Sequence, residues 1–150
     1  MTRLYFAAPL FSEAERDFNI ALTARIEALG YDVFLPQRDG FEKQGSQHAT
    51  LTVAEVAHQI FAVDRSEVYR SDVLLAVLDG RVPDEGVAVE LGLAYAEREH
   101  VGGSRRIIGL MTDWRVAFPS EPLNAMLFGA LDELHTDVDA VLARLAELRD

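Results

Sequence analysis

The sequence predicts an α/β fold in which helices cover both faces of a parallel sheet. Three observations lead to this prediction: expected strands and helices alternate along the chain, residues 73–78 are apolar throughout, and no repeat or linker divides the 150 residues into more than one domain. Alternation of this kind joins parallel strands by right-handed crossovers. A strand without polar residues is typical of one that is buried on both sides.

The N-terminal strand and helix are predicted from their boundaries. Residues 4–8 are apolar, and Pro9 ends the run. Ser12 and Glu15 have the spacing of a capping box, in which each side chain bonds the backbone of the other residue. Gly30 is suited to end the helix that follows. Its apolar positions, at helical spacing, are Phe18, Leu22, Ile26 and Leu29.

Prolines and polar residues mark the next boundaries. Residues 31–35 predict a second strand, which stops at Pro36. The polar residues 36–50 predict a long loop, and loops of that length are commonly functional. A second helix is expected over residues 53–70, before the apolar strand at residues 73–78.

The second half of the chain continues the alternation. A turn at residues 80–84 leads to a helix over residues 86–100, and Gly102 ends that helix before a strand over residues 106–111. The last expected elements are a short helix, a weak fifth strand and a final helix, over residues 124–129, 130–134 and 136–149. Ligands of parallel α/β folds bind beyond the carboxyl ends of the strands. The loops expected to form a site therefore follow Ala7, Leu35, Leu78 and Met111.

The composition excludes several kinds of chemistry. The chain has no cysteine, which rules out a disulfide, a cysteine-ligated zinc, an iron–sulfur cluster and a thiol nucleophile. Its four histidines lack the spacing of metal ligands, and no glycine-rich phosphate loop follows the first strand. We therefore expect no metal and no dinucleotide cofactor.

The charge and hydropathy of the chain indicate which partners it binds and where it is located. The 14 basic and 25 acidic residues give a formal net charge of −11, which repels the phosphates of nucleic acids. No apolar run approaches the ~20 residues of a membrane span, and the N-terminus lacks the layout of a signal peptide. A cytoplasmic protein that binds neither nucleic acid nor membrane is expected.

Three carboxylates lie where the helical pattern predicts buried or capping positions. Asp64 takes the missing place in an apolar row that Ile60 and Val68 continue on either side. Glu90 borders the buried face of the next helix, and Asp84 lies in the turn before that helix. Burying a carboxylate is unfavourable unless it is paired. A poorly hydrated carboxylate is a competent nucleophile, and an acid with a raised pKa is a proton donor.

Each of these positions also has a structural interpretation. Asp64 could pair with an arginine, the stem of Glu90 could cover apolar surface, and Asp84 could cap a helix. Tyr5 falls inside a central strand, where its hydroxyl needs a partner such as a nearby carboxylate. Alternatively, Tyr5 is a core aromatic whose hydroxyl lies at the edge of the sheet.

Four segments occur in a characteristic order: LYFAAPLF at residues 4–11, FLPQRDG at 34–40, DEGVAVELG at 84–92 and PLNAM at 122–126. Together they resemble the nucleoside 2-deoxyribosyltransferase family over most of the chain. The resemblance implies a flavodoxin-like, three-layer sandwich with a parallel sheet of four to five strands. It also implies exchange of nucleobases on 2'-deoxyribonucleosides, with net retention, through a covalent intermediate.

The resemblance assigns roles to particular residues. Glu90 would be the nucleophile, Tyr5 would orient it, Asp64 would handle the proton of the nucleobase, and Asp84 would hold the sugar hydroxyls. Further substrate contacts are expected from Phe11, Gln37 and Gly86, and from Asn124 and Met126 of a neighbouring subunit. The family thus implies a homo-oligomer, commonly a hexamer built from dimers, that acts in nucleotide salvage without a cofactor.

Two other functions are consistent with this type of fold. A hydrolase of nucleoside 5'-monophosphates would hold a phosphate with serine, arginine and glycine after the first strand, where this chain has Ala8-Pro9-Leu10-Phe11, and would replace Asn124 by serine. A non-catalytic flavodoxin-like module would carry an acidic pair or a hydroxyl-rich loop at Ala7-Ala8. The transferase fits these residues best.

Overall fold

The computed structural model describes residues 1–41, 50–113 and 123–149, and a parallel sheet forms its centre. The five strands are β1 (Arg3–Ala7), β2 (Asp32–Phe34), β3 (Val73–Val77), β4 (Arg106–Leu110) and β5 (Glu133–His135). They pair in the order β2-β1-β3-β4-β5, and every pair is parallel. This topology confirms the predicted flavodoxin-like sheet.

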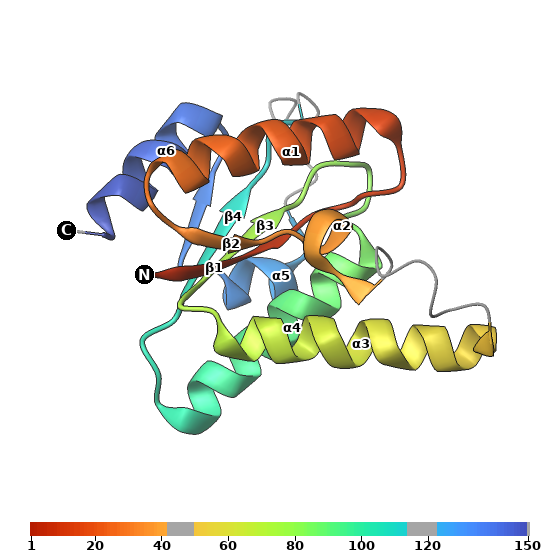
Figure 1. The fold of residues 1–150 in the computed structure, drawn as a ribbon. Coiled ribbons are helices and arrows are strands. Elements are labelled where there is room, and N and C mark those ends of the chain that lie inside the picture. Colours follow the sequence, from red (N-terminus) through yellow and green to blue (C-terminus); the bar gives the residue numbers. More distant parts are fainter. Residues whose placement is uncertain (42–49, 114–122, 150) are drawn as a thin grey trace.

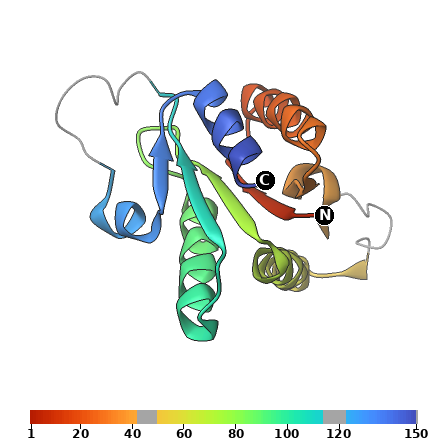
Figure 2. The same ribbon diagram turned by 90° about the vertical axis from the view of Figure 1, so that its left-hand side faces the viewer.

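Helices cover both faces of this sheet, as Figures 1 and 2 show. The helices are α1 (Glu13–Ala28), α2 (Pro36–Asp39), α3 (Val53–Arg70), α4 (Glu85–Val101), α5 (Ala125–Ala130) and α6 (Val138–Glu147). One face packs against α1 and α6, and the other packs against α3, α4 and α5. None of the helices in the described ranges has the length and apolarity that a bilayer span needs.

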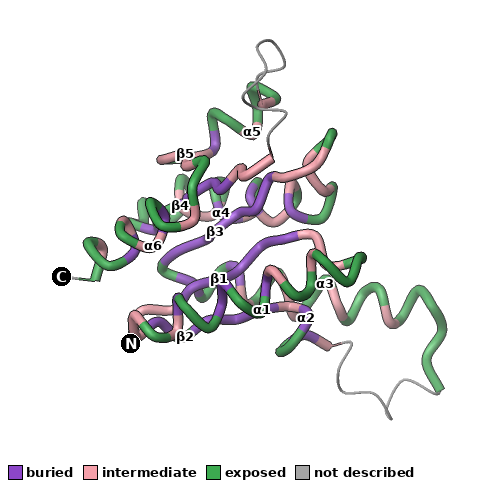
Figure 3. Tube along the Cα trace, turned by 90° about the horizontal axis from the view of Figure 1, so that it is seen from above, coloured by how far each residue is buried: buried purple, intermediate pink, exposed green. Residues whose placement is uncertain are grey.

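The central strands divide the core into two layers. Successive side chains of a strand point to opposite faces, so that Leu4 and Phe6 pack with α1 and α6, whereas Tyr5 and Ala7 pack with α3 and α4. In Figure 3 these strands form the buried middle of the molecule. The alternation places the hydroxyl of Tyr5 on the side of α3 and α4, where the acidic residues lie.

Capping boxes begin the helices α1 and α3. In α1 the Ser12 hydroxyl accepts a hydrogen bond from the Glu15 amide, and the Glu15 carboxylate accepts one from the Ser12 amide, over 3.2 and 2.7 Å. Thr52 and Glu55 form the same pair at the start of α3. Gly30, at φ 89°, follows α1 in the left-handed conformation that favours glycine.

Two predicted segments differ from the structure. The expected loop over residues 36–50 begins with a short helix, α2, because Pro36 suits a first helical turn and the Asp39 carboxylate accepts a hydrogen bond from the Leu35 amide at 2.9 Å. The fifth strand covers residues 133–135 instead of 130–134, because α5 extends to Ala130. Pro122, which belongs to the last resembling segment, lies outside the described residues.

Candidate active site

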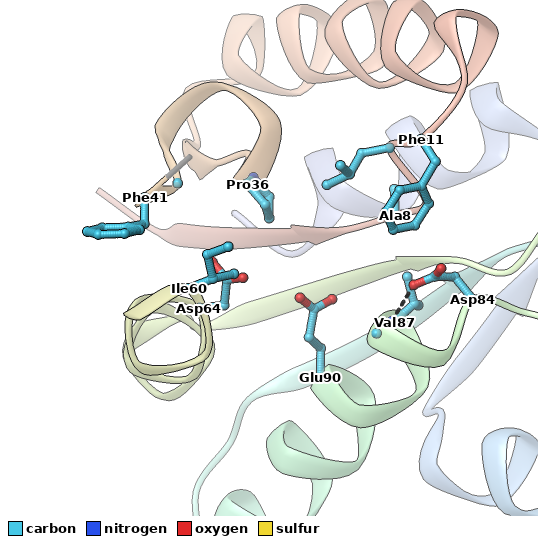
Figure 4. A pocket seen from close by; sticks show the side chains of 12 residues that line it. Ala8, Phe11, Pro36, Phe41, Ile60, Asp64, Asp84, Val87 and Glu90 are labelled. Atoms are coloured by element: carbon cyan, nitrogen blue, oxygen red, sulfur yellow. Dashed lines mark hydrogen bonds between the residues drawn. The ribbon is translucent and has the colours of Figure 1, made fainter. Parts of the chain in front are cut away.

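A cavity of about 210 Å³ lies beyond the carboxyl ends of the first three strands. Its walls come from the segments that follow β1 and β2 and from the facing sides of α3 and α4 (Figure 4). Three of the four loops predicted to form a site therefore contribute. The fourth, after Met111, continues at residue 114 beyond the described residues.

Glu90 projects from the second turn of α4 into this cavity (Figure 4). The Tyr5 hydroxyl donates a hydrogen bond of 2.6 Å to Glu90 Oε1. Tyr5 has an exposed fraction of 0%, and its ring stacks on that of Phe34 with the centroids 5.5 Å apart. The expectation of a carboxylate partner for Tyr5 is confirmed, and the rigid ring fixes one oxygen of Glu90.

The surroundings of Glu90 disfavour its charged form. Burial raises the pKa of Glu90 to about 8, and the negative charges of Asp64 and Asp84 add to this effect, whereas the hydrogen bond from Tyr5 opposes it. Burial, followed by the charges of Glu90 and Asp64, raises the pKa of Tyr5. Tyr5 therefore remains a hydrogen-bond donor, and Glu90 becomes an anion only when the pH or a ligand favours it.

The two aspartates approach the cavity from different elements. Asp64 lies with Ile60 on the side of α3 that lines the cavity. Asp84 caps α4 by accepting a hydrogen bond of 3.1 Å from the Val87 amide, and its carboxylate also lines the cavity. The structural interpretation of Asp84 as a cap is thus confirmed together with its place in the cavity.

Two other candidates lie at the cavity wall. Phe11 has an exposed fraction of 74% and stands opposite Glu90 across the cavity (Figure 4). At Gly86 an added Cβ would lie 2.9 Å from Asp84 Oδ2, so that glycine leaves room for that carboxylate. Phe11 and Gly86 are therefore both placed to contact a ligand in the cavity.

Three candidates do not line the cavity of their own chain. The amide of Gln37 is buried and bonds inside the protein, whereas Pro36 and Gly40 beside it provide the wall. Asn124 caps α5 by accepting a hydrogen bond of 2.9 Å from the Met126 amide. Met126 has an exposed fraction of 82%. Their proposed substrate contacts remain predictions.

Sequence reasoning missed Phe41 and Leu10 as wall residues. Leu10 follows the end of the first predicted strand closely, and Phe41 is an aromatic within an otherwise polar segment, which is the signal that could have revealed it. Charged lining residues of the cavity are all acidic within the described part of the chain: Asp64, Asp84 and Glu90. No group of three potential ligands among the described residues could hold a metal ion.

The fold and the site define a flavodoxin-like α/β protein with carboxylates gathered at the carboxyl edge of its sheet. The chain belongs to the nucleoside 2-deoxyribosyltransferase family, whose model matches residues 4–126. No curated protein sequence matches it significantly.

The chain is similar in fold to solved structures that include proteins from three organisms. A conserved protein from Enterococcus faecalis is 28% identical with a TM-score of 0.79, and the match covers 99% of each chain. A 2-deoxyribosyltransferase from Bacillus psychrosaccharolyticus is 21% identical with a TM-score of 0.73 over 96% of each chain. A 2-deoxyribosyltransferase from Leishmania mexicana is 17% identical with a TM-score of 0.63 over 98% of each chain.

The raised pKa of Glu90 predicts a stability cost that depends on pH. The folded protein binds the Glu90 proton more tightly than the unfolded chain does, so that stability is lost as the pH rises from about 4.5 to about 8. Glu90→Gln does not titrate in this range and should raise the free energy of unfolding by up to about 3 kcal/mol at pH 7. Urea unfolding of both proteins at pH 4, 7 and 9 measures the difference. A difference that does not grow between pH 4 and 7 would contradict the raised pKa of Glu90.

Proposed function

We propose that this protein transfers 2-deoxyribose between nucleobases, with Glu90 as the nucleophile. The observation that carries the proposal is the 2.6 Å hydrogen bond from Tyr5 to Glu90 inside a cavity that two further carboxylates line. Such a carboxylate can stabilise an oxocarbenium-like transition state and then bond with the carbon that carries the positive charge. The Tyr5 hydroxyl leaves the second oxygen of Glu90 available for that bond.

The reaction consists of two displacements at the anomeric carbon. First, the N-glycosidic bond breaks while an oxygen of ionised Glu90 bonds C1', and the departing nucleobase receives its proton from the protonated form of Asp64, so that the reacting enzyme carries one proton on Asp64 and none on Glu90. Next, a second nucleobase attacks C1' and loses a proton to Asp64, and the bond to Glu90 breaks. Each step inverts C1', so that the product keeps the configuration of the substrate. Asp84 holds the sugar hydroxyls from the start of α4.

The acidic lining favours nucleosides over nucleotides. Asp64, Asp84 and Glu90 would repel a phosphate, and the wall after β1 consists of apolar residues such as Leu10 and Phe11. This lining argues against the hydrolase of nucleoside monophosphates. The apolar wall also limits the access of water, which would otherwise hydrolyse the covalent intermediate.

We also propose that active sites are shared between subunits of a homo-oligomer. Asn124 and the exposed Met126 lie away from the cavity of their own chain and are available to a neighbour. Co-expressed Glu90→Gln and Met126→Ala subunits should therefore recover activity that neither variant has alone, because some mixed sites contain both native residues. Activity that equals the average of the two separate variants would contradict a shared site.

Nucleobase exchange tests the proposed reaction. The protein is incubated with deoxyinosine in the presence and absence of adenine, and the products are separated by chromatography. Formation of deoxyadenosine that depends on adenine supports transfer. Release of hypoxanthine at the same rate without adenine would instead identify a hydrolase.

The Tyr5 hydroxyl has an expected kinetic effect. Tyr5→Phe should lower kcat about 10- to 100-fold, because the hydrogen bond that orients Glu90 is lost. That bond also lowers the pKa of Glu90, so that the rising limb of the pH–rate profile should move to higher pH.

A second buried tyrosine provides the control for Tyr5→Phe. Tyr31 has a buried hydroxyl that donates to the Leu145 carbonyl at 2.8 Å, on the opposite face of the sheet. Tyr31→Phe should leave both kcat and the pH profile unchanged. Equal changes in kcat and in the pH profile for the two substitutions would show that Tyr5 acts only as a core residue.

A further inference from the structure

Two amide side chains bond with each other beneath the wall of the cavity. Asn19 of α1 and Gln37 of α2 have exposed fractions of 2% and 8%. Asn19 Nδ2 donates to Gln37 Oε1 and to the Pro9 carbonyl, both over 2.9 Å. Gln37 Nε2 donates to the Arg16 carbonyl, also over 2.9 Å. We call these four hydrogen-bonded groups the amide clamp.

The amide clamp joins two segments that are far apart in the sequence. Pro9 begins the segment after β1, which continues into the wall residues Leu10 and Phe11. Gln37 belongs to α2, the segment after β2 that contributes Pro36 and Gly40 to the same wall. A single side chain, that of Asn19, bonds both segments, so that its two hydrogen bonds fix their separation.

Packing alone does not require an amide at this position. A buried amide is unfavourable unless its donors and acceptors are satisfied, and both Asn19 donors are used. One turn later on the same helix, Thr23 has an exposed fraction of 1% and a hydroxyl without a hydrogen-bond partner among the described residues. Asn19 and Thr23 are both buried on the same face of α1, but only Asn19 forms hydrogen bonds with the segments of the cavity wall.

From these contacts we infer that Asn19 is a positioning residue that sets how tightly the cavity binds its substrate. The inference rests on the proposed transferase function. The side-chain oxygen and nitrogen of Gln37 both bond groups inside the protein. Gln37 therefore affects the substrate only by holding α2 in place. The wall that Asn19 holds faces Glu90 from across the cavity (Figure 4), so that its displacement affects binding more than the covalent step.

Asn19→Leu tests this inference, with Thr23→Val as the matched control. Leucine keeps the approximate size of asparagine but removes both donors, whereas valine keeps the shape of threonine and removes no hydrogen bond. The nucleoside KM of Asn19→Leu should rise about tenfold while kcat changes less than twofold, because a displaced wall weakens the substrate contacts of the cavity by about the free energy of one net hydrogen bond. Thr23→Val should change neither constant. Asn19→Ala, with its higher helix propensity, replaces the leucine variant if that variant does not fold.

Hydrogen exchange gives a readout that does not depend on activity. In the Asn19 variant the backbone amides of residues 10–12 and 38–40 should exchange faster together, while those of Thr23→Val keep the parent rates. An unchanged KM, or equal changes in the two variants, would overturn the inference. If the parent protein itself transfers no sugar, the proposed function fails, and coupled exchange of the two segments still decides whether the clamp exists.

Discussion

Glu90→Ala is expected to abolish sugar transfer while leaving the fold intact. The loss in kcat should reach at least about four orders of magnitude, because no other group could form the covalent bond from the same position. The substitution removes a half-buried carboxyl group that is poorly solvated as an anion, so that the structure should not depend on it. Steady-state exchange between deoxyinosine and adenine measures the effect, and far-ultraviolet circular dichroism verifies the fold.

A second glutamate of the same helix serves as the control for Glu90→Ala. Glu99 is exposed in the last turns of α4 and forms an ion pair with Arg98 at 3.5 Å. Glu99→Ala should retain the parent rate, because an exposed ion pair of this kind contributes little to stability. A folded Glu90→Ala variant that turns over at the parent rate would eliminate Glu90 as the nucleophile.

Asp64→Asn is expected to have the second largest effect. Without a carboxyl group to exchange a proton with the nucleobase, kcat should fall about 10²- to 10⁴-fold for natural nucleosides. The loss should be much smaller for a deoxyribosyl donor whose leaving group needs no proton. Comparing the two donors separates proton transfer from general damage to the site.

The pH profile of Asp64→Asn provides an independent readout. The negative charge of Asp64 helps to raise the pKa of Glu90, so that its removal should lower that pKa and move the rising limb of the profile to lower pH. Asp17→Asn, at an exposed position on α1, should change neither the rate nor the profile. Equal losses with both donors, together with an unshifted profile, would contradict the role of Asp64.

The main elements of the fold are predictable because their signals are local. The apolar residues of β1 and β3 and the capping box of α1 need no information from distant segments. The helix α2 is not predicted although its signals are local as well, because Pro36 begins it and the Asp39 carboxylate accepts a hydrogen bond from the Leu35 amide only four residues earlier. Four residues are too few to show a helical repeat of apolar positions. The limits of β5 depend on pairing with β4, since a strand of three residues has little pattern of its own.

The site is predictable only in part, because some of its contacts join residues of different elements. Helical spacing places Glu90 at the border of the buried face of α4 and Asp64 in the apolar row of α3. It does not reveal that Asn19 and Gln37 bond each other, because these residues belong to different elements. A signal for Asn19 does exist, since a polar residue stands on the face of α1 that buries Leu22 and Ile26.

The central claim is that Glu90 bonds with the anomeric carbon of the sugar. Fluorine at C2' of a 2'-deoxyribonucleoside slows both displacements, because it destabilises their positively charged transition states, and without an acceptor base the covalent intermediate accumulates. The protein is incubated with this donor without an acceptor base, digested and analysed by mass spectrometry. We expect the mass of one sugar on the peptide that contains Glu90, and its removal when adenine is added. A sugar on any other residue, or product formation with no labelled protein under these conditions, would contradict the central claim.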